Sequence, residues 1–295
     1  MLSRGMSRTI SIIGAGRVGA TLGERLRELG WRIGAVVTRS AATARAARRA
    51  IGAGAPRWRL SADILNAEIV LIAVPDGKIA PVAGSLSHIA GRACRGKIVL
   101  HTSGALDKSA LAPLARLGAF TGSIHPMQTF TGRGAPNLKH VIFAIEGHPR
   151  ARRISAQIAR QLGGVPVTIE GSGKPAYHAA GALAAGHALA LIETATRILM
   201  AQGFSRRRAM DALLPLTRQM LENFERHGPR AAWTGPIARG DCDVVAKHAR
   251  ALRQFPREFA QSYAALARLG ARVLAKHPPR AISQLNRALK ENPRR

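Results

Sequence analysis

Residues Thr9 to Gly19 read TISIIGAGRVG, a β-branched strand that runs directly into Gly14-Ala15-Gly16-Arg17-Val18-Gly19. An amphipathic helix over about Val18–Leu29 follows, and Gly30 stands where such a helix should end. In this strand–turn–helix setting, Gly14 permits the tight turn, Gly16 lets the backbone approach a pyrophosphate, and Gly19 lets helix pack on strand. The helix N-terminus adds free N–H groups and a partial positive charge. We therefore expect this loop to bind a dinucleotide; the alternative is a glycine-rich turn without a ligand.

The second expected strand, about Trp31–Thr38, indicates which dinucleotide the loop would hold. NAD sites place an acidic residue about twenty positions past the glycines, but here the sequence reads Thr38-Arg39-Ser40. A guanidinium and a hydroxyl bind a 2′-phosphate that a carboxylate would repel. We predict NADP(H) as the cofactor. Alternatively, Ser40 only caps the helix over residues 41–50 and Arg39 is a solvated charge.

Composition limits the class of protein. The chain has 295 residues and a net charge of +29, mostly from arginine and spread evenly over its two halves. Aromatic residues make up only 4%, so the charge lacks the stacking partners of a nucleic-acid surface, and we expect no specific nucleic-acid partner. The charge would favour anionic ligands. Two cysteines, Cys94 and Cys242, and an N-terminus without an apolar signal segment predict a cytoplasmic protein.

Strand and helix patterns alternate up to about residue 170, and only helical patterns follow. Apolar strands separated by helices are typical of a parallel sheet covered on both faces. We predict an α/β fold: a Rossmann-type doubly wound parallel sheet over residues 1–170, then a smaller all-α domain over residues 171–295. The apolar run Ala176–Leu199 contains two histidines and a glutamate, so we interpret it as a buried helix and expect no membrane partner.

Ligands of such sheets bind outside the carboxyl ends of the strands, where polar groups occur three times. Val74-Pro75-Asp76 would border the cofactor, His101 and Ser103 end another strand, and His125 ends a third. We predict Ser103 and His125 as catalytic residues and His101 as a substrate contact. The alternative for each is a turn cap or a hydrogen-bonded strand-end residue.

A fourth group opens the helical half, where Gly171-Ser172-Gly173 precedes Lys174 and Pro175. Proline belongs in the first turn of a helix, so Lys174 should lie at a helix N-terminus, whose positive end would lower the pKa of its amine. Such an amine is a good proton donor to a carbonyl or imine. His178 lies four residues on, near the same helix face. Both are predicted catalytic residues, the alternative being a snorkelling lysine and a core histidine.

A polar loop farther on, Thr234 to Asp241, contains Arg239. Its guanidinium is a candidate for binding a substrate carboxylate, although the loop equally fits a turn between helices. The sequence contains no cluster spaced as a closed metal site, so we expect no structural metal.

Six segments resemble one known family: GAGRVG, LIAVPD, HTSGAL, SIHPMQTF, GKPAYHAAG and TGPIARGD. The chain resembles the bacterial family that joins a Rossmann-like NADP oxidoreductase domain to a C-terminal domain of unknown function, within the 6-phosphogluconate-dehydrogenase-like superfamily. Relatives by architecture include ketopantoate reductase, pyrroline-5-carboxylate reductase and prephenate dehydrogenase. The resemblance implies that Lys174 is a catalytic lysine. Four residues after this lysine the relatives have asparagine, whereas this chain has His178. The resemblance also implies a homodimer formed through the helical domains.

Together these features predict an NADP(H)-dependent oxidoreductase that transfers a hydride between the nicotinamide and a small anionic carbonyl, imine or hydroxy compound. The alternative is a non-catalytic NADP-binding sensor or interaction protein on the same scaffold.

Overall fold

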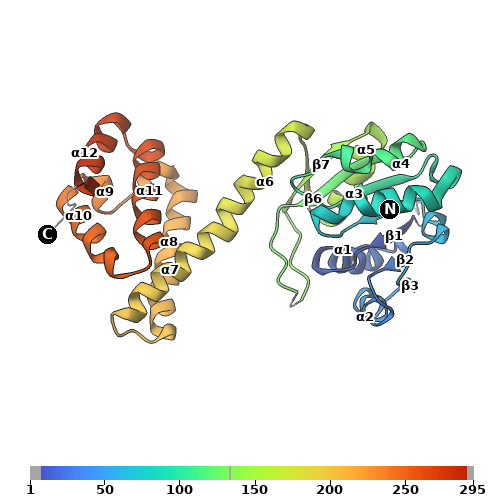
Figure 1. The fold of residues 1–295 in the computed structure, drawn as a ribbon, viewed down its shortest axis with the longest axis horizontal. Coiled ribbons are helices and arrows are strands. Elements are labelled where there is room, and N and C mark those ends of the chain that lie inside the picture. The colour runs from blue at the N-terminus through green and yellow to red at the C-terminus, as the bar shows by residue number, and fades with distance from the viewer. Residues whose placement is uncertain (1–7, 133, 291–295) are drawn as a thin grey trace. The chain divides into compact units, whose positions relative to one another are not determined.

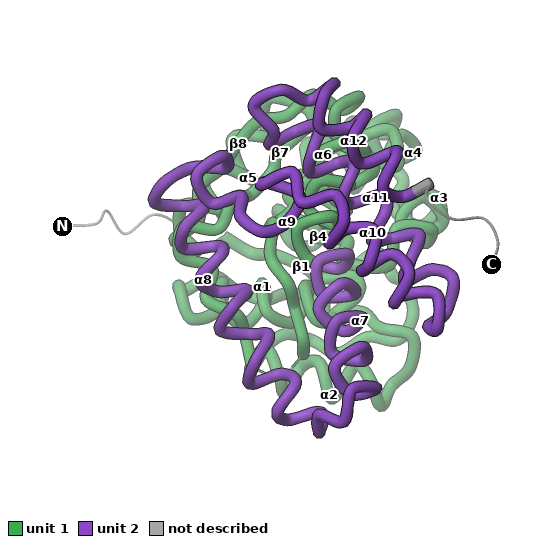
Figure 2. The backbone as a smooth tube through the Cα atoms, turned by 90° about the vertical axis from the view of Figure 1, so that its left-hand side faces the viewer, with its two compact units in different colours: residues 1–185 green, residues 186–295 purple. Residues whose placement is uncertain are grey.

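The computed structural model describes residues 8–132 and 134–290, so most of the N-terminal segment without a signal pattern lies outside the described residues. The chain forms two compact units, residues 1–185 and residues 186–295 (Figure 2). The predicted boundary at residue 170 differs from this division because the helix that begins the second half contacts the sheet with its first turns.

The first unit is built on one eight-stranded sheet with the order β3-β2-β1-β4-β5-β6-β7-β8 (Figure 1). The strands are β1 Thr9–Ile13, β2 Arg32–Val37, β3 Ala55–Arg57, β4 Ile69–Ile72, β5 Ile98–His101, β6 Phe120–Pro126, β7 Ile142–Gly147 and β8 Val165–Thr168. All neighbours are parallel except β6 and β7, which are antiparallel. The predicted doubly wound sheet is confirmed, with this reversal and the short β3 as differences. A strand buried on both faces looks alike in either direction, so its pattern does not reveal the reversal.

Helices cover both faces of the sheet. They are α1 Arg17–Glu28, α2 Ala41–Ile51, α3 Asp76–Ala90, α4 Ala112–Arg116 and α5 Pro149–Gln161, with 3₁₀ turns at Ala62–Asn66, Gly91–Cys94, Lys108–Leu111 and Gly171–Gly173. Helix α6, Lys174–Ala182, buries only Lys174 and leads away from the sheet (Figure 1). Apolar side chains of α1 and α5 join one core cluster with β6 and β7, and those of α3 and α4 join another with β4 and β5. The 3₁₀ turn Lys108–Leu111 runs directly into the short α4, which begins with Pro113 in its first turn.

The second unit is helical throughout its described residues. Its helices are α7 Ala188–Ala201, α8 Arg206–Ala232, α9 Pro236–Arg239, α10 Cys242–Ala251, α11 Arg257–Leu274 and α12 Pro278–Lys290, with a π-turn at Leu183–His187 before α7 and a 3₁₀ turn at Leu252–Gln254. Small and branched residues of α10, α11 and α12 form its core, which contains Val245, Ala246, Ala267, Ala271, Leu285 and Ala288. Helix α8 is interrupted at Gly228, whose φ of 79° is left-handed.

The prediction of a buried apolar helix over 176–199 is wrong. The continuous helix Gly171–Ala201 is long and apolar enough to cross a membrane by length and composition, but only 6% of its apolar window is buried. Several of its leucines therefore face outward, among them Leu183 and Leu189. An apolar pattern shows that a helix has an apolar face. It does not show whether other residues of the same chain bury that face.

Candidate functional site

The glycine turn after β1 has the geometry that its sequence predicts. Gly14 has a φ of 89°, and a Cβ there would lie 2.6 Å from the Ala73 carbonyl oxygen. A Cβ on Gly19 would lie 2.2 Å from the Gly14 carbonyl oxygen, so any side chain would push α1 off the strand. Gly16, by contrast, has no atom within 4 Å of its Cβ position. It stands as the N-cap of α1 without a side-chain cap, which leaves backbone N–H groups open to a ligand.

The residues after β2 divide between a structural role and an open one. Ser40 is the N-cap of α2, and its hydroxyl accepts a hydrogen bond of 3.2 Å from the backbone N–H of Thr43. The Thr38 hydroxyl lies 2.7 Å from the Thr43 hydroxyl. The capping alternative for Ser40 is thus realised. Arg39 is exposed, and within the described residues its guanidinium makes no hydrogen bond or ion pair.

A cleft of about 360 Å³ lies along the carboxyl edge of the sheet, entirely within the first unit. It joins the glycine turn to the ends of β4, β5 and β6 and to α6. Its lining includes Gly16, Arg17, Val18, Ala73, Val74, Pro75, Asp76, Thr102, Ser103, Gly104, His125, Pro126, Gln128, Phe130 and His178. Several residues predicted from separate motifs therefore border one cavity.

Two histidines meet where the cleft borders the end of β6, three strands from β1 and its glycine turn. His125 of β6 and His178 of α6 pack edge to face with ring centroids 5.8 Å apart. The Nδ1 atom of His125 lies 3.0 Å from the Tyr177 hydroxyl. A Cβ on Gly104 would lie 2.6 Å from His178 and 2.8 Å from Nε2 of His125, so this position requires glycine. Burial, aided by the Lys174 charge, lowers the pKa of His125 to about 4. The ring is therefore neutral near pH 7.

Lys174 is the first residue of α6 and is completely buried. Its Nζ atom donates hydrogen bonds to the Ser103 carbonyl oxygen at 2.9 Å and to the Ser123 hydroxyl at 2.7 Å. The pKa of the amine is lowered to about 8, as expected in direction, but burial is the main cause rather than the helix terminus. The snorkelling alternative is wrong. Unlike His178, Lys174 is not among the residues that line the cleft.

Ser103 and His101 hold the turn after β5. The Ser103 hydroxyl accepts hydrogen bonds from the backbone N–H groups of Ala105 and Leu106, at 3.1 and 3.0 Å. His101 is fully buried; its Nδ1 atom accepts from the Ser103 N–H at 3.2 Å, and Nε2 lies 3.0 Å from the Asp107 carbonyl oxygen. Burial lowers the pKa of His101 to about 4. Both ring nitrogens of His101 are thus occupied by backbone.

Three polar residues near the cleft escape the sequence reasoning. Ser123 binds Lys174, Tyr177 binds His125, and the buried Glu146 accepts a hydrogen bond of 2.8 Å from the Lys108 N–H. Burial raises the pKa of Glu146. Ser123 was detectable in principle, because residues i and i+2 of a strand share a face and His125 follows two positions later. Glu146 stands opposite Ser123 only through the antiparallel register of β6 and β7.

Arg239 belongs to the second unit, at the end of α9. Its Nε atom donates to Asp241 at 2.9 Å, and the pair is exposed. This contact occupies part of the guanidinium within the loop itself, so the predicted substrate contact stays a prediction.

Comparisons with known proteins give two family matches. The model of a Rossmann-like domain matches residues 4–126, and the model of a domain of unknown function, DUF2520, matches residues 141–269. The second match begins at the antiparallel strand β7, so this family includes the last strands of the sheet as well as the helices. A search of curated proteins finds no match.

Solved structures with the same fold come from several organisms. A candidate NADP oxidoreductase from Bacteroides fragilis is 22% identical, with a TM-score of 0.73 over 89% of this chain and 97% of its own. A reductive aminase from Aspergillus terreus, solved with NADPH and ethyl-5-oxohexanoate, is 17% identical with a TM-score of 0.66 over 90% and 94%. An imine reductase from Myxococcus stipitatus, solved with NADP⁺, is 19% identical with a TM-score of 0.66 over 96% and 100%. These likenesses concern the fold. With both family models matched in sequence order, the chain belongs to the proteins that join a Rossmann-like domain to a DUF2520 domain.

Proposed function

We propose that this protein is an NADP(H)-dependent oxidoreductase acting on a small carbonyl, imine or hydroxy compound. The observation that carries the proposal is the single cleft that runs from the open N-terminus of α1 to the His125–His178 pair. One end suits a pyrophosphate and the other suits proton transfer. The same cleft without a reacting partner would serve a sensor, so the test below separates the two.

The residues present fit a dinucleotide phosphate. The empty volume at Gly16 leaves room for a pyrophosphate against the first N–H groups of α1, beside Arg17 and Val18. The uncommitted guanidinium of Arg39 supports a 2′-phosphate contact at the end of β2. The hydroxyls of Thr38 and Ser40 already bind Thr43, so we assign them to holding this turn. Val74, Pro75 and Asp76 would border the cofactor from the end of β4. That structural neighbours are solved with NADPH or NADP⁺ supports the same assignment.

NADPH, when bound, supplies a hydride to the substrate carbon, and NADP⁺ accepts one. His125 is the proposed proton donor and acceptor. With Nδ1 held by the Tyr177 hydroxyl, its neutral ring carries hydrogen on Nε2, the atom beside Gly104 in the cleft. As Nε2 gives this proton to a carbonyl oxygen or imine nitrogen, Nδ1 takes the Tyr177 proton. Burial raises the pKa of Tyr177 to about 12, so its half-buried oxygen then takes a proton back from solvent. Tyr177 and His125 thus form a short proton relay. His178 packs against the ring and borders the same space for the substrate.

Lys174 is buried outside the cleft lining, whereas Ser103 belongs to the lining and uses its hydroxyl to hold the turn after β5. We assign Lys174 as a positioning residue: its amine anchors the Ser103 carbonyl and the Ser123 hydroxyl, and its charge lowers the pKa of His125. A fully buried amine with two partners does not reach a substrate directly. Because both ring nitrogens of His101 contact backbone atoms, we assign His101 to holding the turn rather than to substrate binding.

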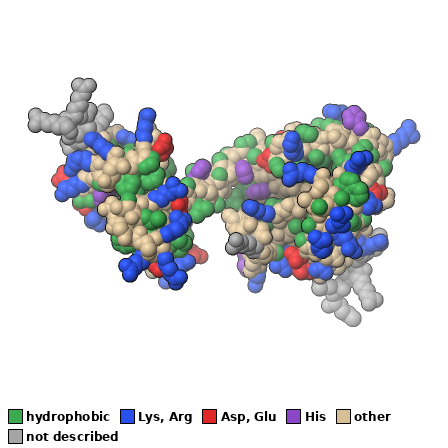
Figure 3. All heavy atoms as spheres, turned by 60° about the horizontal axis from the view of Figure 1, so that its bottom comes forward, with side chains coloured by type: hydrophobic (Ala, Val, Ile, Leu, Met, Phe, Trp, Pro, Cys, Tyr) green, Lys and Arg blue, Asp and Glu red, His purple; other side chains and the backbone are tan. Residues whose placement is uncertain are grey.

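The substrate class rests on coarser support. A neutral imidazole backed by the Tyr177 hydroxyl can relay a proton to an oxygen or nitrogen as hydride arrives at carbon, which includes carbonyl and imine reduction. The neighbours named as imine reductase and reductive aminase support this class. Lys and Arg side chains are scattered over the visible face of both units (Figure 3), and this field would steer a small anionic substrate.

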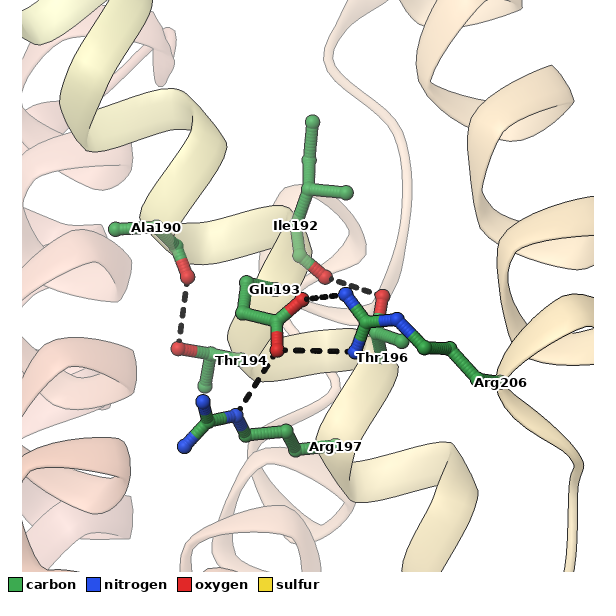
Figure 4. A network of polar contacts seen from close by, with 7 residues as sticks. All are labelled: Ala190, Ile192, Glu193, Thr194, Thr196, Arg197 and Arg206. Carbon is green, nitrogen blue, oxygen red and sulfur yellow. Dashed lines mark hydrogen bonds and ion pairs between the residues drawn. The ribbon is translucent and has the colours of Figure 1, made fainter.

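The exposed apolar helices support a homodimer. In the second unit, α7 and α8 leave large side chains uncovered, including Leu189 at 67% exposure and Leu216 at 68%. Such a surface favours a protein partner over lipid because Glu193 of α7 binds Arg197 and, through both oxygens, Arg206 (Figure 4). Burying this charged group in hydrocarbon would cost several kcal/mol, roughly. Free thiols at Cys94 and Cys242 support a cytoplasmic location.

Binding and turnover together test the proposal. Arg39→Asp should weaken NADPH binding by about tenfold or more and leave NADH binding nearly unchanged, because only NADPH carries the 2′-phosphate. Calorimetric titration of both nucleotides measures this difference. Equal losses for the two nucleotides would refute the assignment of Arg39.

Turnover is measured with NADPH and a panel of keto acids and cyclic imines, on wild type and Lys174→Met. The enzyme reading is supported if wild type reduces at least one compound and Lys174→Met does not reduce it. NADPH binding without turnover across the panel would instead favour the sensor.

A further inference from the structure

A second cavity lies beside the end of β3, apart from the cleft described above. It has a volume of about 730 Å³ and is lined by Arg57, Trp58, Arg59, Ser61 and Asp63. Strands β2 and β3 are parallel neighbours with Val37 opposite Arg57, and the Thr38 N–H donates to the Arg57 carbonyl oxygen at 3.0 Å. The loop that carries Trp58 and Arg59 therefore runs beside the loop that carries Arg39, at the same edge of the sheet.

Trp58 is the aromatic element of this cavity. Its side chain is 53% exposed, whereas Trp31 is 7% exposed and donates its indole hydrogen to Gln161 at 3.0 Å. An uncovered indole in a cavity offers a flat face on which a base can stack. Nothing in the packing of the first unit requires a tryptophan at this exposed position.

The charges of the cavity are unequally engaged. Arg57 binds Asp63 through Nε at 3.0 Å and through Nη2 at 2.9 Å, and Ser61 donates to the other oxygen of Asp63. These partners lower the pKa of Asp63 and hold the loop in shape. Arg59 is exposed, and among the described residues it has no ion pair or hydrogen bond. The cavity therefore offers an aromatic face and one uncommitted guanidinium, with its carboxylate already neutralised.

We propose that this cavity binds the adenosine end of the dinucleotide, with Trp58 stacked on the adenine and Arg59 joining Arg39 on the 2′-phosphate. The inference rests on the proposed function, since it assigns the far end of the same ligand. An aromatic ring and two guanidiniums on adjacent loops are the groups that recognise a phosphorylated purine nucleoside. Neither residue belongs to the glycine turn or to the segment after β2.

The experiment uses adenosine 5′-monophosphate and adenosine 2′,5′-bisphosphate, which lack the nicotinamide. Trp58→Ala should raise the Kd of both by about tenfold, because both carry the base. Arg59→Ala should raise only that of the bisphosphate, by about tenfold. Leu29→Ala and Arg92→Ala are matched controls, since both residues are exposed and lie toward the amino ends of the strands. Bisphosphate binding should also quench tryptophan fluorescence in wild type and not in Trp58→Phe, which keeps Trp31 and Trp233.

Two failures are distinguishable. If wild type binds NADPH while Trp58→Ala and Arg59→Ala bind both probes as the control variants do, the adenosine assignment is overturned and the proposed function stands. If folded wild type binds neither NADPH nor the bisphosphate, the proposed function itself is overturned, and this inference falls with it.

Discussion

The two units differ in the side chains that they bury and expose: the first buries polar side chains, and the second exposes apolar ones. The first unit buries polar side chains and gives most of them partners. Each of the following is buried and makes at least one hydrogen bond: Ser11, His101, Ser103, Ser123, Glu146 and Lys174. The second unit leaves apolar side chains of α7 and α8 in the open. Buried polar groups cost free energy unless bonded, and exposed apolar patches mark contact surfaces. The first unit therefore holds its polar side chains in fixed geometry, and the second presents the apolar surface on which the proposed homodimer depends.

The largest expected effect concerns His125, the half-buried ring that borders the cleft. His125→Asn should lower kcat by about 10²–10⁴-fold, because the amide cannot exchange a proton at the position of Nε2. NADPH affinity should change by less than about threefold, since His125 lies at the other end of the cleft from Gly16. Tyr177→Phe should lower kcat less, because the ring remains and only its hydroxyl partner is lost. A variant that retained a third of wild-type kcat would remove His125 from the chemistry.

The next largest effect is a loss of folding stability in acid, through the buried ring of His101. The folded-state pKa of His101 is about 4, below the value near 6.5 of an unfolded histidine. Between these values the unfolded chain binds a proton that the native chain does not, so stability falls as pH drops from about 6.5 to 4 and is constant above. Over this window His101 contributes about 3 kcal/mol. Urea unfolding at pH 7, 5.5 and 4 measures the loss. Because His125 has the same folded-state pKa of about 4, His101→Gln should remove roughly half of the loss. Equal slopes in both proteins would contradict the buried neutral ring.

A smaller effect contrasts the packing of the two units through glycine. Gly19→Ala places a methyl group 2.2 Å from a backbone oxygen and should cost about 2–3 kcal/mol, or roughly 5–10 °C in Tm. Gly186→Ala, at the start of the second unit, meets no atom within 4 Å and should be neutral or slightly stabilising. Thermal unfolding of the two variants measures the difference. Similar shifts would mean that the close packing at Gly19 relaxes easily.

The same contrast explains what the sequence could predict. The glycine turn depends on residues within one strand–turn–helix, so Gly14, Gly16 and Gly19 could be assigned their positions from local rules. The cleft edge followed from strand ends, which brought Val74, Ser103 and His125 together. Lys174 was found as a helix-start lysine, but its burial depends on Ser103 and Ser123, 71 and 51 positions earlier in the chain. No local pattern encodes such a contact.

Two further features were beyond local reasoning for different reasons. The reversal of β7 is set by its pairing with β6, and the apolar content of β7 is compatible with either direction. The exposure of α7 was mispredicted because its apolar residues satisfy the pattern of a core helix equally well. An interface helix and a core helix differ in what covers them, and a sequence does not state whether the cover is in the same chain.

The smallest expected effect concerns the exposed apolar face of α8 in the proposed homodimer. Leu216→Glu places a charge on the open face of α8 and should raise the dissociation constant of the proposed homodimer by at least about tenfold, since burial of a leucine is worth roughly 1.5–3 kcal/mol. Leu29→Glu is the control, because Leu29 is 49% exposed on the first unit. Sedimentation velocity across a concentration series measures both. If Leu29→Glu dissociated the protein and Leu216→Glu did not, the contact surface would lie on the first unit, and the open leucines of α8 would need another explanation. If only Leu216→Glu acts, the apolar surface of the second unit is the face that a second copy covers.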